Sequence, residues 1–82
     1  MTELELFAKA TLEQGGVWEL IRQDGELGLY QSNSKFMWDG RYIHYLNPVY
    51  QIFKNGNRIF ASSYFFEAFK MYETELEQNR GE

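Results

Sequence analysis

Three glycine-containing dipeptides constrain the fold of this chain more than any other feature of its sequence. Asp24-Gly25, Asp39-Gly40 and Asn55-Gly56 each suit a two-residue hairpin turn, in which both central residues need a positive φ. The dipeptides lie 15 and 16 residues apart, which leaves room for two short strands between successive turns. The spacing therefore predicts an antiparallel meander over residues 17–62.

Two softer breaks, Asn33-Ser34 and Asn47-Pro48, divide this segment further. The resulting pieces have the length of strands, and most are rich in aromatic or β-branched residues. They comprise residues 17–23, 26–32, 35–38, 41–46, 49–54 and 57–61. Because the piece at 35–38 is only four residues long, we expect five or six short strands.

Two-residue turns also predict which residues lie opposite one another. The pairs expected around Asn55-Gly56 are Phe53 with Arg58, Ile52 with Ile59 and Gln51 with Phe60. Around Asp24-Gly25 they are Leu20 with Leu29 and Trp18 with Gln31. The face expected to lie against the core holds Tyr50, Ile52, Ile59 and Ala61. We expect helices to cover that face and the other face to be partly solvated.

Helices are predicted at both ends of the meander, over residues 2–14 and 63–79. Thr2 and Glu5 have the spacing of a capping box, and Gly15-Gly16 can close the first helix in the left-handed conformation. Ser62 or Ser63 can cap the second helix. Its apolar stripe consists of Phe65, Ala68, Phe69, Tyr72 and Leu76. The predicted fold is a single α+β domain over residues 1–82, with the C-terminal helix packed on the sheet.

Length and composition limit the classes of protein that fit. A chain of 82 residues has material for one core, and its 44% hydrophobic content argues against disorder. The absence of cysteine excludes disulfides and thiolate metal sites. No apolar run approaches the roughly 20 residues of a membrane-spanning helix, and no basic, apolar leader begins the chain. We therefore expect a cytoplasmic protein that does not contact membranes.

Charge is distributed unevenly along the chain, whose net charge is −4. Residues 1–14 carry three glutamates and one lysine, and residues 63–82 carry five glutamates and two cations. Residues 15–62 carry five cations and four acids. Acidic ends around a nearly neutral middle do not favour binding to a phosphate backbone, but they suit a protein partner with a basic surface.

The inventory for catalysis is small. His44 is the only histidine, and we interpret it as an ordinary strand residue because no serine and carboxylate are placed to form a triad with it. Gly25 and Gly28 lack the spacing of a dinucleotide fingerprint. The sequence therefore predicts a protein that is not an enzyme and that has no cofactor and no metal.

Aromatic and charged side chains supply the candidates for a binding surface. Five aromatic residues are expected in the core: Phe7, Trp18, Phe65, Phe69 and Tyr72. The placement of Trp38, Tyr42 and Phe53 decides whether the sheet presents a binding surface. The predicted partner-binding residues are Trp38, Arg41, Tyr42, Arg58, Glu67, Glu73 and Glu77, with the glutamates directed at the basic partner.

An alternative function is the binding of single-stranded nucleic acid on an open aromatic and basic sheet face. The stacking platform would consist of Lys35, Phe36, Trp38, Arg41, Tyr42, Phe53 and Arg58. The net negative charge argues against this alternative, and a cation–π pair between Arg58 and Phe53 is expected instead. A sheet edge could also pair with a second copy to form a homodimer.

The segment from Tyr50 to Ser63, followed by Phe-Phe-Glu-Ala-Phe-Lys-Met-Tyr-Glu, resembles the hairpin-then-helix unit common in small proteins of phages and mobile elements. A tiny, acidic, cysteine-free α+β chain also resembles phage-encoded inhibitors of host defence, including anti-CRISPR proteins. The resemblance implies a non-catalytic inhibitor that occupies a basic, nucleic-acid-binding surface of a host protein. It assigns no role to any individual residue.

Overall fold

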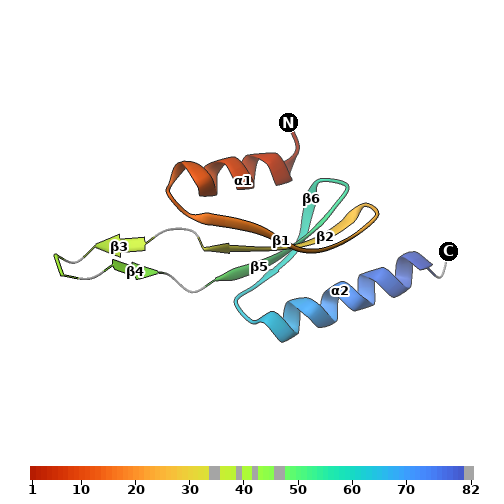
Figure 1. Cartoon of the computed structure of the whole chain (residues 1–82). Coiled ribbons are helices and arrows are strands. Elements are labelled where there is room, and N and C mark those ends of the chain that lie inside the picture. The colour runs from red at the N-terminus through yellow and green to blue at the C-terminus, as the bar shows by residue number, and fades with distance from the viewer. Residues whose placement is uncertain (34–35, 39, 42, 46–47, 81–82) are drawn as a thin grey trace.

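The structure is a computed structural model that describes residues 1–33, 36–38, 40–41, 43–45 and 48–80, with the backbone alone for residues 36–38, 43–45 and 79–80. Its elements are α1 (Glu3–Glu13), β1 (Val17–Asp24), β2 (Leu27–Asn33), β3 (Phe36–Trp38), β4 (Ile43–Tyr45), β5 (Val49–Lys54), β6 (Asn57–Ser62) and α2 (Phe65–Arg80). The predicted α+β class, with a helix at each end of an antiparallel sheet, is confirmed. Figure 1 shows that α1 and α2 lie on opposite faces of this sheet, so the expectation of one solvated face was wrong.

The main sheet of the described residues has four strands in the order β1-β2-β5-β6, not five or six. The strands β3 and β4 pair with each other in a separate ribbon, which we call the arm. The numbers of two paired residues add to 81 in the β2–β5 pairing and also in the β3–β4 pairing of the arm. The arm therefore continues the register of β2 and β5. Strand β1 begins opposite Asn33 and β6 ends opposite Tyr50, which leaves the arm without outer strands (Figure 1).

The first hairpin turn lies one residue later than predicted. Strand β1 continues through Asp24, and the loop consists of Gly25 and Glu26. Gly25 has φ +60°, as a turn with glycine at its first central position requires. A bulge at Ile21 shifts the register again, so Leu20 lies opposite Tyr30. The predicted pairs of Leu20 with Leu29 and Trp18 with Gln31 were therefore wrong, and Trp18 lies opposite Ser32.

The second hairpin turn is confirmed at Asn55-Gly56, where φ is +55° and +81°. The predicted pair of Phe53 with Arg58 is also confirmed. A bulge follows directly, so Ile52 lies opposite Phe60 and Gln51 opposite Ala61. The extra residue is Ile59, which is 42% exposed. The prediction that Ile59 lies on the core face was therefore wrong. Phe60 packs there instead.

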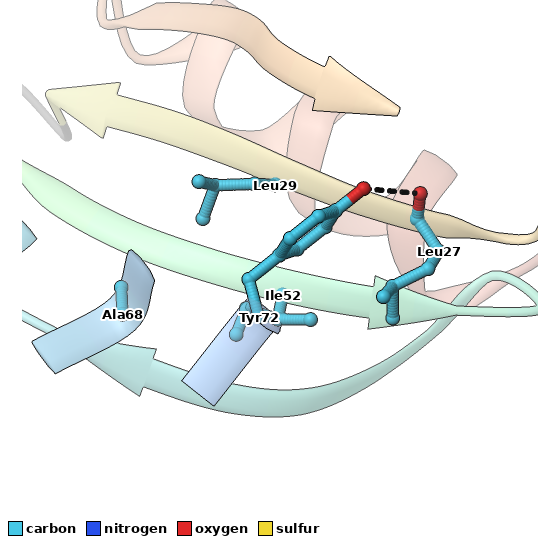
Figure 2. Packing of buried hydrophobic residues seen from close by; sticks show 5 residues of the cluster. All are labelled: Leu27, Leu29, Ile52, Ala68 and Tyr72. Carbon is cyan, nitrogen blue, oxygen red and sulfur yellow. Dashed lines mark hydrogen bonds between the residues drawn. The ribbon is translucent and has the colours of Figure 1, made fainter. Parts of the chain in front are cut away.

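The main core lies between the sheet and α2. Leu27, Leu29 and Ile52 from the sheet pack against Ala68 and Tyr72 from α2, and all five are buried (Figure 2). The apolar stripe predicted for this helix is thus confirmed at its centre. Phe65 was expected inside the core but is 38% exposed, because it lies at the first position of the helix.

A second apolar layer lies between the sheet and α1. Phe53 follows Ile52 in β5 and therefore faces the opposite side of the sheet, where its ring contacts Phe7, Trp18 and Tyr30. Phe53 is buried, which excludes it from the open stacking face considered above. Phe7 and Trp18 are half-buried, so they lie inside as predicted but at the margin of the molecule.

Both ends of α1 have the capping contacts that the sequence indicates. The Thr2 hydroxyl accepts the backbone N–H of Glu5 at 3.2 Å. At the other end, Gly15 has φ +80°, and the N–H groups of Gly15 and Gly16 bond to the carbonyls of Leu12 and Thr11. This pair of bonds is the Schellman motif, which needs glycine at the left-handed position.

Candidate protein-binding surface

Arg58, a predicted contact residue, joins α1 to β6. Its guanidinium lies 4.5 Å from the centre of the Phe7 ring, so its cation–π partner is Phe7 and not Phe53 as predicted. The backbone N–H of Arg58 donates to Glu3 Oε1 at 2.7 Å. The backbone N–H of Leu4 donates to the carbonyl of Gly56 at 2.9 Å. These contacts hold the N-terminal end of α1 on the second hairpin, which gives Arg58 a structural role.

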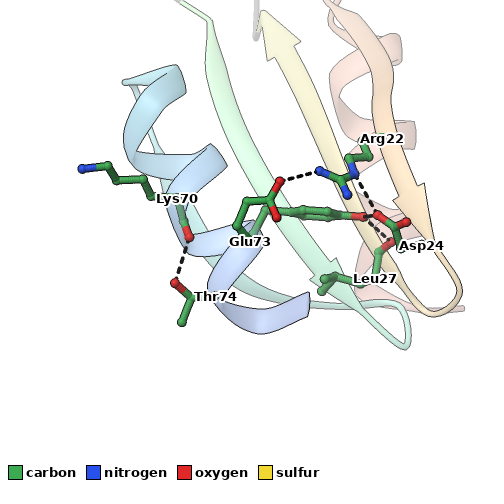
Figure 3. Close-up of polar contacts among 7 residues, drawn as sticks. Arg22, Asp24, Leu27, Lys70, Glu73 and Thr74 are labelled. Atoms are coloured by element: carbon green, nitrogen blue, oxygen red, sulfur yellow. Dashed lines mark hydrogen bonds and ion pairs between the residues drawn. The ribbon is translucent and has the colours of Figure 1, made fainter. Parts of the chain in front are cut away.

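Glu73, another predicted contact residue, lies in the seam between α2 and β1. Glu73 Oε1 pairs with the Arg22 guanidinium at 2.7 Å, and Arg22 Nε also pairs with Asp24 Oδ2 at 2.9 Å (Figure 3). Arg22 Cζ lies 5.1 Å from the centre of the Tyr72 ring. Glu73 is therefore already paired within the molecule, although it shares the single positive charge of Arg22 with Asp24, and this pairing makes it less suited to a partner than an exposed glutamate.

The Tyr72 hydroxyl completes this seam. It lies 2.6 Å from Asp24 Oδ2, to which it donates, and 3.2 Å from the carbonyl of Leu27. Burial, followed by the hydrogen bond to Asp24, raises the pKa of Tyr72 well above its usual range, because both disfavour the charged phenolate. The hydrogen bond to Glu73 is the main cause that raises the pKa of Arg22. Tyr72 and Arg22 thus stay protonated and fix α2 to the sheet.

The other two predicted glutamates, Glu67 and Glu77, are exposed. They share the outward side of α2 with Lys70, which is also exposed. Glu67 Oε2 accepts the Ser62 hydroxyl at 3.1 Å, and Ser62 Oγ accepts the backbone N–H of Tyr64 at 3.0 Å. Ser62 thus forms a side-chain turn just before α2, which begins at Phe65, and its hydroxyl also contacts the Glu67 carboxylate. A capping role for Ser62 or Ser63 stays a prediction.

Two of the remaining predicted contact residues, Trp38 and Arg41, belong to the arm. Trp38 lies opposite Ile43 at the last pair of β3 and β4, and Arg41 is exposed between the two strands. Tyr42, like Lys35 and Asp39, lies outside the described residues. A contact role for Trp38, Arg41 and Tyr42 stays a prediction.

Three consecutive aromatic residues at the start of α2 form an exposed surface, which we call the aromatic patch: Tyr64, Phe65 and Phe66. Tyr64 is 72% exposed and Phe66 is 79% exposed. The Phe65 ring contacts Phe66 at 6.0 Å, Tyr50 at 5.4 Å and Phe69 at 5.7 Å between centroids. Since Tyr50 and Phe69 pack against the main core, the Phe65 ring connects the patch to that core.

Tyr64 and Phe66 were not among the contact residues predicted from the sequence, although their positions relative to the apolar stripe indicate exposure. Neither residue belongs to the stripe of Phe65, Ala68, Phe69, Tyr72 and Leu76. Aromatic residues that lie off the buried stripe of an amphipathic helix face solvent. An inspection of the off-stripe positions would have found both of them.

Within the described residues, no group of three or more His, Asp and Glu side chains is arranged to hold a metal ion. Nor does a pocket open on this part of the chain. Neither α1 nor α2, the helices of the described residues, combines the length and the apolar character that a membrane span requires.

No protein-family model, curated protein or solved structure matches this chain. The function must therefore be argued from the surface of the molecule itself.

Proposed function

We propose that this chain is a non-enzymatic protein-binding module that contacts its partner through the aromatic patch and the exposed glutamates of α2. The partner has a basic surface. By occupying that surface the chain inhibits a protein that binds nucleic acid, as the resemblance to small phage-encoded inhibitors implies.

The observation that carries this proposal is the exposure of Tyr64 and Phe66. These two residues are 72% and 79% exposed, although they stand beside the buried core cluster. Placing large aromatic rings in water gives up the roughly 1.5–3 kcal/mol that burial of such a side chain contributes. Contiguous exposed aromatics of this kind are typical of surfaces that become buried in a complex.

The charge of the chain supports a basic partner. The net charge is −4, and Glu67 and Glu77 are exposed on the same helix as the patch. An acidic helix attracts a basic protein over long range and raises the association rate more than the affinity. Because Glu73 is paired with Arg22, we assign the attraction to Glu67 and Glu77.

The test is capture of partners from lysate of the source cells by the wild-type chain and by the double variant Tyr64→Ser and Phe66→Ser. We expect the variant to lose the partner and the wild type to reduce the partner's binding to nucleic acid. Leu6→Ser is the matched control, since Leu6 is 53% exposed but lies on α1, and it should leave binding intact. Full binding by the double variant would contradict the proposal.

A further inference from the structure

Among the side chains that the structure describes, two arginines lie over aromatic rings. Arg58 lies over the ring of Phe7, with 4.5 Å from its Cζ atom to the ring centre. Arg22 lies over the ring of Tyr72 at 5.1 Å and pairs with the carboxylate of Glu73 at 2.7 Å. A guanidinium suits such a site because it is planar: its face stacks on a ring while its N–H edge donates to a carboxylate.

The Arg22 site uses two consecutive residues of α2, an aromatic residue followed by a glutamate. The same pair recurs six residues earlier as Phe66 and Glu67. Consecutive residues of an α-helix are always about 100° and 1.5 Å apart, so the backbone offers both pairs in the same relation. Figure 3 shows how Glu73 reaches the arginine across the seam. Phe66 is 79% exposed and is contacted by the Phe65 ring at 6.0 Å between centroids, so most of this residue stays open to a partner.

The carboxylate of the earlier pair is held in place before any partner arrives. Ser62 Oγ donates to Glu67 Oε2 at 3.1 Å and is itself fixed by the backbone N–H of Tyr64. Each carboxylate oxygen can accept more than one hydrogen bond, so Glu67 keeps capacity for a guanidinium. A preorganised acceptor lowers the entropy that binding costs.

We propose that Phe66 and Glu67 form a receptor for one arginine side chain on the surface of a basic partner protein. The guanidinium stacks on the Phe66 ring and donates to the Glu67 carboxylate, as Arg22 does with Tyr72 and Glu73. The net charge of −4 complements such a partner. Lys70 is exposed one turn away on the same helix, and its positive charge repels an incoming arginine. This inference rests on the proposed function, because it names the chemistry of the partner at the aromatic patch.

The experiment titrates the full chain with two octapeptides of equal charge, in which glycine alternates with arginine or with lysine, and follows the NMR signals of α2. We expect the arginine peptide to shift Phe66 and Glu67 and to bind about two- to fivefold more tightly than the lysine peptide. Phe66→Leu, which keeps an apolar side chain but removes the ring, should abolish this preference. Glu67→Gln should abolish it as well.

Glu77→Gln is the matched control, because Glu77 is an exposed glutamate of the same helix that follows Leu76 and not an aromatic residue. It removes the same charge and should retain the arginine preference. Equal binding of both peptides to the wild type, or a preference that persists in Phe66→Leu, overturns the arginine receptor but leaves a basic partner in place. Loss of the preference in Glu77→Gln also overturns the receptor. No shift in α2 with either peptide overturns the basic partner too.

Discussion

The two helices contribute to this fold in different ways. Helix α2 buries Ala68 and Tyr72 completely and connects to β1 through Arg22, Asp24 and Glu73. None of the 11 described residues of α1 is buried, and this helix is held by its N-terminal contacts with the second hairpin and by Phe7. Helix α2 therefore carries much of the stability, whereas α1 covers a sheet face that is already closed by its own aromatic rings.

The largest expected effect separates the helices by their cores. Tyr72→Ala should lower the free energy of unfolding by about 3–5 kcal/mol, since it removes a fully buried ring. Phe7→Ala should cost about 1–2 kcal/mol, because the Phe7 ring is only half-buried. Urea denaturation followed by circular dichroism measures the loss of unfolding free energy in both variants. If Tyr72→Ala is unfolded without urea while Phe7→Ala is folded, the loss is again larger for Tyr72→Ala. Equal losses would remove the difference between the helices.

The next effect concerns the turn on which α1 rests. Gly56 has φ +81°, and a Cβ there would lie 2.9 Å from Thr2 Cβ, so Gly56→Ala should cost more than the roughly 1–2 kcal/mol of a left-handed alanine. Gly25→Ala is the control, because Gly25 has φ +60° and nothing within 4 Å. The difference in unfolding free energy between the two variants measures how firmly α1 contacts the hairpin. Identical values would mean that Thr2 moves aside without cost.

A smaller effect tests the polar seam of α2. Tyr72→Phe should cost about 0.5–1.5 kcal/mol at neutral pH, since Asp24 loses the hydrogen bond from the hydroxyl. The raised pKa of Tyr72 means that its contribution is complete below about pH 10, where unfolded tyrosine ionises, and is lost as the pH rises further. The wild type should therefore lose stability more steeply above pH 10 than Tyr72→Phe. Parallel slopes would contradict the raised pKa, and Tyr64→Phe controls for an exposed hydroxyl.

The smallest effect is confined to α1. Thr2→Ala removes the cap that accepts the Glu5 N–H and should cost about 0.5–1 kcal/mol. Amide hydrogen exchange should become faster in the first turn of α1 and stay unchanged in α2. Faster exchange in both helices would show that they unfold as one unit.

Glycine and capping residues made much of the fold predictable. The turn at Asn55-Gly56, the end of α1 at Gly15 and the cap at Thr2 depend on local conformation, which the sequence encodes directly. The pairing of residues beyond Leu20 and Ile52 was not predictable, because one extra residue in a strand reverses the alternation that pairing arguments use. For the same reason, the alternation of residues along a strand did not predict which face of the sheet each helix covers.

The candidate surface was also predictable from the sequence only in part. Exposure of Glu67 and Glu77 follows from their positions off the apolar stripe of α2. The pairing of Glu73 with Arg22 joins residues 51 positions apart, and helix periodicity contains no information about such a contact. Arg58 likewise stacks on a ring from α1 that lies far from it in sequence.

The extra residues Ile21 and Ile59 also affect how molecules of this chain meet at high concentration. Each interrupts an outer strand of the sheet, β1 on one edge and β6 on the other. A bulged outer strand cannot present an even row of hydrogen-bonding groups to a neighbouring molecule. Both borders of the sheet therefore resist the edge-to-edge stacking that leads to fibrils, and this resistance also disfavours a dimer built by joining two sheets.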